Sequence, residues 1–155
     1  MEVLRTPPRI KVLEALGSIA DERIELRGEK SAVVRSSMGD RTYRVCIDVD
    51  KGIAYSDDNG TRFRKYIGYP IIALMMLKGL LPYDSEIASA LRGIPWKELN
   101  EKYKRYFIVE RIVKETCRAR GIEPGRVDAF VSKVLSALRK YRLMYSSECL
   151  EVTDR

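Results

Sequence analysis

The chain lacks histidine and glutamine altogether, and Asn59 and Asn100 are its only asparagines. Without histidine, neither a Ser-His-Asp triad nor a Cys-His pair can form, which excludes two common forms of nucleophilic catalysis. The glycines are scattered and form neither a GxGxxG motif nor a P-loop, the familiar glycine-rich phosphate-binding sequences. We therefore predict no catalytic residues, no cofactor, and a protein that is not an enzyme.

Cysteine is also scarce, and Cys46, Cys117 and Cys149 are its only occurrences. No two of them form a CxxC pair, and without histidine to complete the ligand set the usual zinc site cannot be assembled. We therefore predict that the protein holds no metal ion. Two interpretations of the cysteines stay open: buried, unreactive thiols, or one disulfide, because intracellular disulfides do occur in hyperthermophilic organisms.

Amide side chains are few, whereas charged residues make up 33% of the chain. Few thermolabile amides with many charged residues are typical of hyperthermophile proteins, which suggests an archaeal or thermophilic bacterial source. The longest apolar run, residues 66–77, is far shorter than the ~20 residues that span a bilayer, and residues 1–8 contain no apolar core of a signal peptide. We expect a cytoplasmic protein with no membrane partner.

The net charge of +7 is distributed unevenly along the chain. Residues 1–60 carry 10 basic and 11 acidic side chains, for a net charge of −1, and residues 121–155 carry 6 and 5, for +1. Residues 61–120 carry 13 basic and 6 acidic side chains, so the whole excess of +7 lies in the middle of the chain. A local basic excess favours a polyanionic partner such as nucleic acid.

The hydrophobic pattern predicts an α+β fold that begins with an N-terminal helix. Apolar residues recur at helical spacing over residues 7–20, with Thr6 as the expected N-cap and Pro7 at the first helical position. Residues 24–65 contain short apolar stretches separated by turn residues, and residues 42–49 alternate between apolar and polar side chains, which predicts an antiparallel β-meander of four to five strands. Within this meander, Asn59-Gly60 is a strong signal for a type I′ hairpin turn, with residues 61–67 as the next strand.

From Pro70 onward the pattern is helical, which predicts a C-terminal bundle of four to five helices. Residues 71–81 are apolar nearly all round, so we expect that helix to be buried between the sheet and the bundle. Gly121 is expected to end one helix and Pro124 to begin the last. Strands and helices that segregate along the chain favour a single α+β domain, residues 1–145, followed by a C-terminal tail, residues 146–155.

Residues 43–74 contain a predicted hairpin, a turn, and a helix whose first residues include Ile-Ile-Ala-Leu. This layout resembles the SWIM zinc finger, a ββα module associated with DNA and protein binding, in which a CxC ends the hairpin and a CxH opens the helix. Residues 56–58 would occupy the first pair of ligand positions, and Gly68 and Pro70 the second. All four zinc ligands are thus replaced, so the resemblance implies no zinc. The alternative is an ordinary hairpin followed by a buried helix.

Residues 74–104 also fit a helix-turn-helix, in which residues 95–104 would form the recognition helix. Ile87, Ala88 and Leu91 would pack the first helix on the core, and Gly93 would lie in the turn. The exposed side of the recognition helix would offer Lys97, Asn100, Lys102, Lys104 and Arg105. Lys and Arg contact phosphates, and Asn can read an adenine edge. The alternative is a trihelical core that has the same pattern and binds nothing.

A third candidate is the basic stretch at residues 62–66. On a strand, Arg62, Arg64 and Tyr66 would share one face, with Lys65 between them. Two guanidinium groups beside an aromatic ring can hold a phosphate backbone and stack a base. The alternative is an edge strand that is protected from aggregation by its charge.

Four aspartates cluster around the predicted hairpin: Asp48, Asp50, Asp57 and Asp58. The segment 45–61 resembles the opening hairpin of ribonuclease-H-like nucleases, which implies that Asp48 would bind a divalent metal ion through oxygen ligands. The later strands and acidic helix residues of that fold are not visible downstream. Asp50 and Asp57 also suit ordinary turn positions.

The sequence favours a non-enzymatic nucleic-acid-binding protein that contacts phosphates through residues 61–120. The candidate binding residues are Arg62, Arg64, Lys65, Tyr66, Lys97, Asn100, Lys104 and Arg105. Two alternatives remain. One is a protein-interaction or assembly subunit that does not bind nucleic acid, and the other is a metal-dependent nuclease that uses Asp48.

Overall fold

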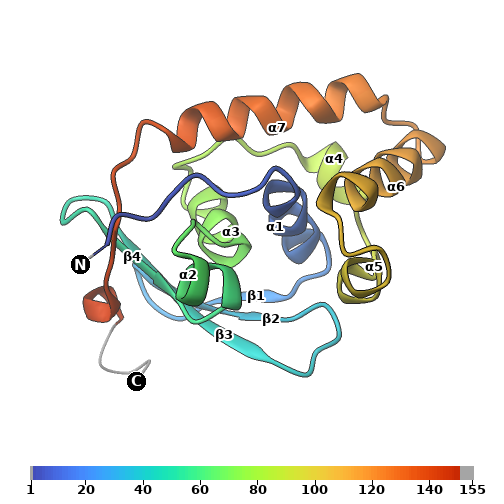
Figure 1. The fold of residues 1–155 in the computed structure, drawn as a ribbon. Helices are drawn as coiled ribbons and strands as arrows, with labels where there is room; N and C mark the ends of the chain where they lie inside the picture. The colour runs from blue at the N-terminus through green and yellow to red at the C-terminus, as the bar shows by residue number, and fades with distance from the viewer. Residues whose placement is uncertain (1, 151–155) are drawn as a thin grey trace.

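A computed structural model describes residues 2–150 of the chain and shows the predicted α+β fold (Figure 1). The elements in chain order are α1 (Ile10–Ala20), β1 (Ile24–Leu26), β2 (Ser31–Arg35), β3 (Thr42–Asp48), β4 (Ile53–Ser56), α2 (Asn59–Arg64), α3 (Tyr69–Leu77), α4 (Ser85–Ala90), α5 (Trp96–Tyr103), α6 (Tyr106–Ala119), α7 (Pro124–Leu138), β5 (Met144–Tyr145) and the 3-10 turn η1 (Ser147–Cys149). Helices α1 and α3 lie over one face of the sheet, and α7 crosses them on the side away from the strands.

The sheet has five strands in the order β1-β2-β3-β4-β5. The first four form the predicted antiparallel meander, in which Val33 pairs with Arg44 and Cys46 pairs with Tyr55. The fifth strand comes from the C-terminal end of the chain and runs parallel to β4. The meander therefore has four strands, and the strand that completes the sheet is separated from β4 by all of the helices from α2 to α7.

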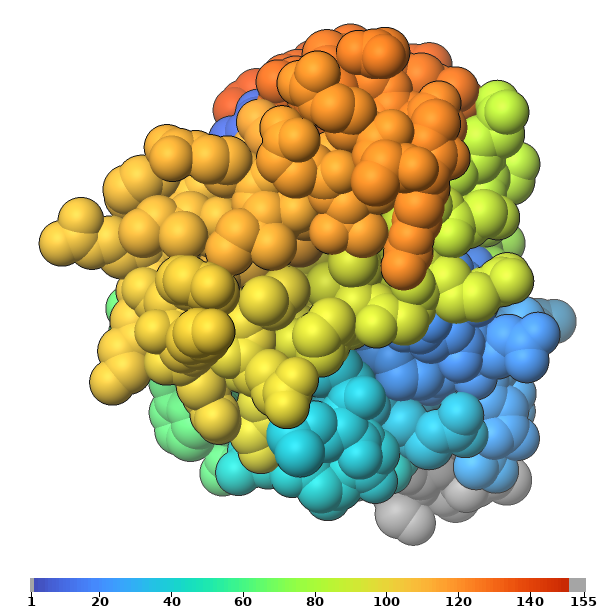
Figure 2. Space-filling view, turned by 90° about the vertical axis from the view of Figure 1, so that its right-hand side faces the viewer, coloured from blue at the N-terminus to red at the C-terminus, as the bar shows by residue number. Residues whose placement is uncertain are grey.

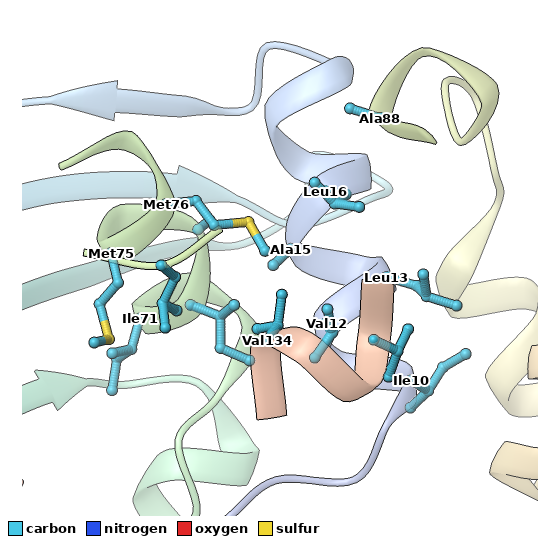
Figure 3. Close-up of a cluster of buried hydrophobic side chains, with 14 of the residues drawn as sticks. Ile10, Val12, Leu13, Ala15, Leu16, Ile71, Met75, Met76, Ala88 and Val134 are labelled. Carbon is cyan, nitrogen blue, oxygen red and sulfur yellow. The ribbon is translucent and has the colours of Figure 1, made fainter. Parts of the chain in front are cut away.

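Helix α3 is the apolar helix that the sequence predicts to be buried, and its residues 70–76 are all buried. It packs against the sheet on one side and against α1 on the other, and α1 in turn contacts α4, α6 and α7. Figure 3 shows Leu13 and Leu16 of α1, Ile71 of α3 and Val134 of α7 in the same cluster. The core is thus organised around α1 and α3, which are covered by strands below and by the C-terminal helices above.

The segment after β4 corrects the predicted hairpin, because Asn59 and Gly60 form the first turn of α2. The Asp58 carboxylate caps this helix by accepting hydrogen bonds from the Thr61 amide at 3.2 Å and the Thr61 hydroxyl at 2.7 Å. Gly60 provides space, since a Cβ atom there would lie 2.4 Å from the Tyr66 ring. The prediction of a turn at residues 59–60 and a strand at 61–67 was therefore wrong.

The N-terminal helix also begins later than predicted, at Ile10, with Arg9 at the N-cap in place of Thr6. The residues before it cross the ends of other elements, and the Leu4 amide donates to the Leu143 carbonyl at 2.8 Å. Gly121 has the positive φ of a helix-ending glycine, and α7 begins at Pro124 as predicted. Within residues 2–150, no helix combines the length and apolarity needed to cross a membrane.

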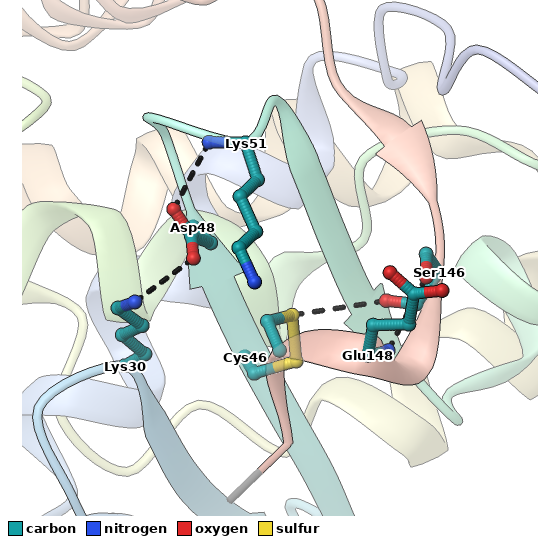
Figure 4. The surroundings of a disulfide bond; sticks show 7 residues. Lys30, Cys46, Asp48, Lys51, Ser146 and Glu148 are labelled. Atoms are coloured by element: carbon teal, nitrogen blue, oxygen red, sulfur yellow. Dashed lines mark hydrogen bonds and ion pairs between the residues drawn. A yellow bond between two sulfur atoms is a disulfide. The ribbon is translucent and has the colours of Figure 1, made fainter.

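Residues 146–150 fall in the predicted tail, and the structure places them against the sheet (Figure 4). Cys149 of η1 forms a disulfide with Cys46 of β3, across 103 positions of sequence. The Ser146 amide also donates to the Ala54 carbonyl of β4 at 3.1 Å. Cys117 is a free, buried thiol whose pKa is raised by its burial, so the two interpretations of the cysteines apply to different residues. The rest of the predicted tail, 151–155, lies outside the described residues.

Candidate functional site

The structure divides the eight predicted binding residues between two places. Arg62, Arg64, Lys65, Tyr66, Lys104 and Arg105 lie at the end of α2 and at the junction between α5 and α6. Lys97 and Asn100 form the second group and lie on the side of α5 that faces α1 and the turn between β2 and β3. The group at the end of α2 and the α5–α6 junction is described first.

The end of α2 presents three cations around an exposed aromatic ring. Arg62 and Arg64 are exposed in the last turn of the helix, and the ring of Phe63 between them is 69% exposed. The Arg62 guanidinium lies 5.1 Å from the centre of that ring. Lys65 ends the helix with its ammonium group 4.5 Å from the centre of the Tyr145 ring. Arg62 and Arg64 therefore project from a helix and not from one face of a strand, which corrects their expected arrangement.

The α5–α6 junction presents a second stretch of the same character. Lys104 ends α5, Arg105 is the N-cap of α6, and both side chains are exposed. Tyr106 and Phe107 follow in the first turn of α6, with 45% and 57% of their surface exposed. Figure 2 shows the side of the molecule that carries α5 and α6. This stretch therefore repeats the combination of adjacent cations and exposed aromatic rings found at the end of α2.

Two tyrosines bring the two stretches together, although they are about forty positions apart in the sequence. Tyr66 follows Lys65, Tyr106 follows Arg105, and the side chains of the two tyrosines lie close enough to interact electrostatically with each other and with Lys11. Burial raises the pKa of Tyr66, and the neighbouring Tyr106 adds to the rise. The Lys11 ammonium lies 5.1 Å from the centre of the Tyr106 ring. Tyr66 is thus a buried connector and not a base-stacking residue.

We call the combined feature the basic–aromatic surface, which consists of Arg62, Phe63, Arg64, Lys65, Lys104, Arg105, Tyr106 and Phe107. Within residues 2–150, none of its five cations forms an ion pair with a carboxylate. Its positive charge is therefore available to a partner outside the chain.

Two lysines of this surface occupy an unusual backbone conformation. Lys65 has a φ of 54° and Lys104 a φ of 56°, both in the left-handed region. Helices commonly end in this conformation, but usually at glycine, because a Cβ atom makes it unfavourable by about 1 kcal/mol. Both helices of the basic–aromatic surface thus end at a lysine where glycine would fit the backbone better. Glu22, outside this surface, is the third non-glycine residue with such a φ among residues 2–150, so two of the three lie in the basic–aromatic surface.

Asn100 faces α1, which corrects its expected position on the exposed side of a recognition helix, and Lys97 is partly exposed but paired with an acid. The Lys97 ammonium lies 3.1 Å from an Asp40 carboxylate oxygen in the turn between β2 and β3. The Asn100 amide donates to the buried Glu14 carboxylate of α1 at 3.0 Å. The solvent-facing residues of α5 include Glu98, Glu101 and Lys102. Two of these three are acidic, so α5 does not present the phosphate-contacting face of a recognition helix.

A pocket of about 490 Å³ lies between α5 and the sheet, and we call it the α5 pocket. Its lining includes Arg23, Tyr43, Tyr69, Trp96 and Asn100. Figure 2 shows the turn between β2 and β3, drawn in cyan, reaching α5, drawn in yellow, on this side of the molecule. Aromatic and hydrogen-bonding side chains from β3, α3, α5 and the connection between α1 and β1 therefore converge on one concave site.

Glu14 anchors the wall of the α5 pocket that belongs to α1. It is 4% exposed, and the Lys11 ammonium lies 3.1 Å from its carboxylate. Burial by itself lowers the pKa of Lys11, but the attraction of Glu14, Tyr66 and Tyr106 outweighs it and leaves the pKa above its ordinary value. Lys11 therefore stays protonated and joins the basic–aromatic surface to the wall of the pocket.

The α5 pocket also collects the buried polar atoms that have no hydrogen-bond partner within the described part of the chain. These atoms are Arg23 Nε, Trp96 Nε1 and Asn100 Oδ1, and all three residues line the pocket. Arg23 is 7% exposed, and its Nη1 atom donates to the Arg35 carbonyl at 2.7 Å. The Arg23 Nε atom lies 3.8 Å from an Asp21 carboxylate oxygen, beyond hydrogen-bond distance. Buried polar atoms are nearly always hydrogen-bonded, so these exceptions around one pocket favour a site for a ligand with its own donors and acceptors.

The four aspartates of the predicted hairpin do not converge on a metal-binding site. Asp48 accepts hydrogen bonds from the Lys30 ammonium at 2.9 Å and the Lys51 amide at 3.1 Å (Figure 4), and these contacts hold its pKa below the usual range. Asp57 pairs with Arg44, and Asp58 caps α2. Over residues 2–150, no group of three or more His, Cys, Asp or Glu side chains could hold a metal ion.

The sequence analysis did not predict several residues of the basic–aromatic surface and of the α5 pocket. Phe63 and Phe107 were missed because an exposed phenylalanine has the same sequence pattern as a buried one. Their position beside basic residues in the sequence was the one feature that could have indicated that they are exposed. Arg23 and Tyr69 were missed because only the folded chain shows that they share a pocket with α5.

Comparison with known proteins assigns the chain to a family. Residues 4–144 match the model of a family described as uncharacterised conserved protein UCP014422. The chain belongs to this family. No curated protein and no solved structure matches the chain. The residues that match the family include the whole basic–aromatic surface and every residue that lines the α5 pocket, and they end before Cys149.

Proposed function

We propose that this protein binds nucleic acid, and that the basic–aromatic surface is its binding site. The observation that carries the proposal is the meeting of two cationic stretches, each with exposed aromatic rings, through the contact between Tyr66 and Tyr106. Cations without carboxylate partners neutralise phosphates and release their counterions. Exposed rings beside those cations stack on bases, which every base permits.

Single-stranded nucleic acid fits this surface better than a duplex. In a duplex the faces of the bases are covered by their neighbours, so the rings of Phe63 and Phe107 would have nothing to stack on. In a single strand the bases are free to stack on aromatic side chains, and this stacking is worth about 1–3 kcal/mol per base. The proposal therefore predicts weaker binding to duplex DNA than to a single strand of the same length.

The competing proposal is a subunit that docks on another protein, since exposed aromatic and arginine side chains are also enriched at protein interfaces. The five cations of the surface, which have no acid between them, favour the polyanion.

The test is a titration of labelled single-stranded DNA, single-stranded RNA and duplex DNA, followed by fluorescence anisotropy. The variant Arg62→Glu/Arg64→Glu/Lys104→Glu should bind at least about 100-fold more weakly than the original protein, because three phosphate contacts become repulsions. The matched control is Lys133→Glu/Arg139→Glu/Lys140→Glu, which changes the net charge equally on exposed residues at the end of α7. An equal loss in both variants would show that only net charge matters, and binding that survives in the first variant would overturn the proposal.

A further inference from the structure

The α5 pocket lies beside the basic–aromatic surface, because two helices contribute to both. Asn59 begins α2 and lines the pocket, and Arg62 lies three positions later on the same side of that helix. Asn100 of α5 also lines the pocket, and Lys104 ends the same helix four positions later. A strand whose phosphates are held by Arg62 and Lys104 would therefore run past the pocket.

The charges that line the pocket favour a neutral occupant. They are three cations and three anions: Arg23, Arg41, Lys97, Glu14, Asp40 and Glu101. Lys97 and Asp40 already pair with each other, and Glu14 pairs with Lys11. A phosphate group would therefore meet as many carboxylates as cations in the pocket. It would be held better by the basic–aromatic surface outside.

The hydrogen-bonding atoms of the pocket favour an occupant with both donors and acceptors. Among the described residues, the Nε1 atom of Trp96 is a donor and the Oδ1 atom of Asn100 an acceptor without a hydrogen-bond partner, and the Nε atom of Arg23 has only a carboxylate oxygen of Asp21 at 3.8 Å. A ligand that satisfies such atoms recovers the cost of leaving them unpaired. Tyr43 and Tyr69, whose ring centres lie 6.3 Å apart, add aromatic surface to the same lining.

We infer that the α5 pocket binds one unstacked nucleobase of the strand that lies on the basic–aromatic surface. A nucleobase is neutral and planar, has donors and acceptors on its edge, and stacks on aromatic rings. Proteins that recognise single strands bind splayed bases in this way, by stacking and by hydrogen bonds to the base edge. The inference rests on the proposed function, because the phosphates on either side of the base are held by the basic–aromatic surface.

Trp96 makes the inference measurable, because it is the only tryptophan of the chain and it lines the pocket. Single-stranded oligonucleotides of adenine, cytosine or thymine are titrated against the protein, beside an abasic oligomer with the same number of phosphates and beside free nucleosides. At least one base-containing oligomer should change the emission of Trp96 and bind about tenfold more tightly than the abasic one. The abasic oligomer should bind through its phosphates and leave the emission unchanged.

Two variants and a matched control identify the place where the base binds. Asn100→Leu removes the hydrogen-bonding group, and Asn59→Phe blocks the pocket from an exposed position that the core does not use. Both should abolish the change in Trp96 emission while retaining binding to the abasic oligomer. Phe63→Ala should weaken binding to base-containing oligomers and retain the emission change, because Phe63 lies outside the pocket. Circular dichroism checks that each variant is folded. If Asn100→Leu does not fold, Asn59→Phe alone tests whether the base binds in the pocket.

The outcomes separate this inference from the proposed function. If base-containing and abasic oligomers bind equally, or if Trp96 emission never changes, the strand binds by its phosphates alone and the inference fails while the proposed function stands. If no oligomer binds, the proposed function fails. If nucleosides bind but oligomers do not, the pocket takes a free nucleoside, and both proposals are overturned.

Discussion

Two groups of basic side chains in this protein differ in what lies beside them. On the face formed by α6 and α7, Arg9 and Lys114 each lie 3.0 Å from Asp128, and Arg126 lies 2.9 Å from both Asp84 and Glu86. On the basic–aromatic surface, none of the five cations has a carboxylate partner in residues 2–150. The first group holds helices together, whereas the second is available to bind a polyanion.

This difference shows what a charge count along the sequence leaves out. Residues 61–120 carry a net charge of +7, but Lys97, Lys114 and Arg118 within that segment are neutralised by nearby carboxylates. Of the ten other basic residues of that segment, which have no carboxylate partner among residues 2–150, five make up the basic–aromatic surface and five lie elsewhere: Lys78, Arg92, Lys102, Arg111 and Arg120. A basic residue contributes to binding only where the fold leaves it without an acidic neighbour, and each of the following predictions tests that statement.

The largest difference should appear when salt is varied. Five phosphate contacts on a single strand predict a slope of about −3.5 in the plot of log affinity against log salt, or a loss of roughly 100-fold between about 50 and 200 mM salt. The free energy of unfolding should change little over the same range, since surface ion pairs contribute less than about 1 kcal/mol each. Anisotropy titrations and urea unfolding at both salt concentrations measure the two quantities. A slope near zero would show that the unpaired cations are not contacts.

We call the face formed by α6 and α7 the paired face, because its cations lie beside carboxylates. Removing those carboxylates should affect the stability of the fold and not the binding of a single strand. Glu110→Gln with Asp128→Asn removes the carboxylates that neutralise Arg9 and Lys114, and should destabilise the fold by about 1–2 kcal/mol. Affinity for a single strand should rise less than threefold or so, because neither Arg9 nor Lys114 has an exposed aromatic residue next to it in the sequence. Urea unfolding and anisotropy measure both effects. A gain in affinity as large as the loss in the charge-reversed variant would contradict the comparison.

Acid should weaken the paired face before it affects the basic–aromatic surface. Partial burial by itself raises the pKa of Asp84, but hydrogen bonds from the Ile87 amide and Arg126 outweigh it and lower the pKa below its ordinary value. A lowered folded-state pKa means that Asp84 contributes stability above the pKa of the unfolded carboxyl, near 4, which is lost as pH falls through the lower folded-state value.

Asp84→Asn should therefore cost about 1 kcal/mol at neutral pH, because Asp84 also caps α4 and asparagine retains part of the cap. The difference in unfolding free energy between the two proteins should shrink as pH falls below about 4. Urea unfolding of both proteins across this range measures it. A difference that is constant with pH would mean that the charge of Asp84 contributes nothing.

The smallest effect is expected at Lys104, where binding and stability should change in opposite directions. Lys104→Gly removes one cation and fits a backbone φ of 56°, so the fold should be unchanged or up to about 1 kcal/mol more stable. Loss of one phosphate contact should make the salt slope shallower by about 0.7 on a single strand. Lys133→Gly is not a suitable control because it lies inside α7, whereas Lys65→Gly is suitable and should behave like Lys104→Gly. A lower free energy of unfolding for Lys104→Gly would mean that the lysine side chain stabilises the fold.

Much of the fold follows from periodicity in the sequence. The strands of the meander and helices α3 and α7 were predicted because one face or all faces of each are apolar, and burial selects that pattern. The segment at residues 59–67 was mispredicted because Asn59-Gly60 is equally compatible with a hairpin turn. Two interactions of the folded chain decided for a helix: the cap by Asp58 and the Tyr66 ring packed on Gly60.

The candidate site was predicted only in part, for a reason that lies in distance along the chain. The cations Arg62, Arg64, Lys104 and Arg105 could be found because basic residues are conspicuous in a sequence. Their proximity depends on the contact between Tyr66 and Tyr106, which no local pattern encodes. The α5 pocket depends on contacts between still more distant segments, so no pattern in the sequence indicates that its residues lie together.

The short parallel strand β5 also determines how the sheet meets other molecules. Without it, β4 would present the unpaired backbone groups of Ile53–Ser56 to solvent, which is the kind of edge along which sheets of separate molecules join and aggregate. Strand β5 covers part of that edge and is itself only two residues long, too short to serve as a template. Because the disulfide between Cys46 and Cys149 fastens the segment that follows β5, a covalent bond helps to keep this edge of the sheet covered.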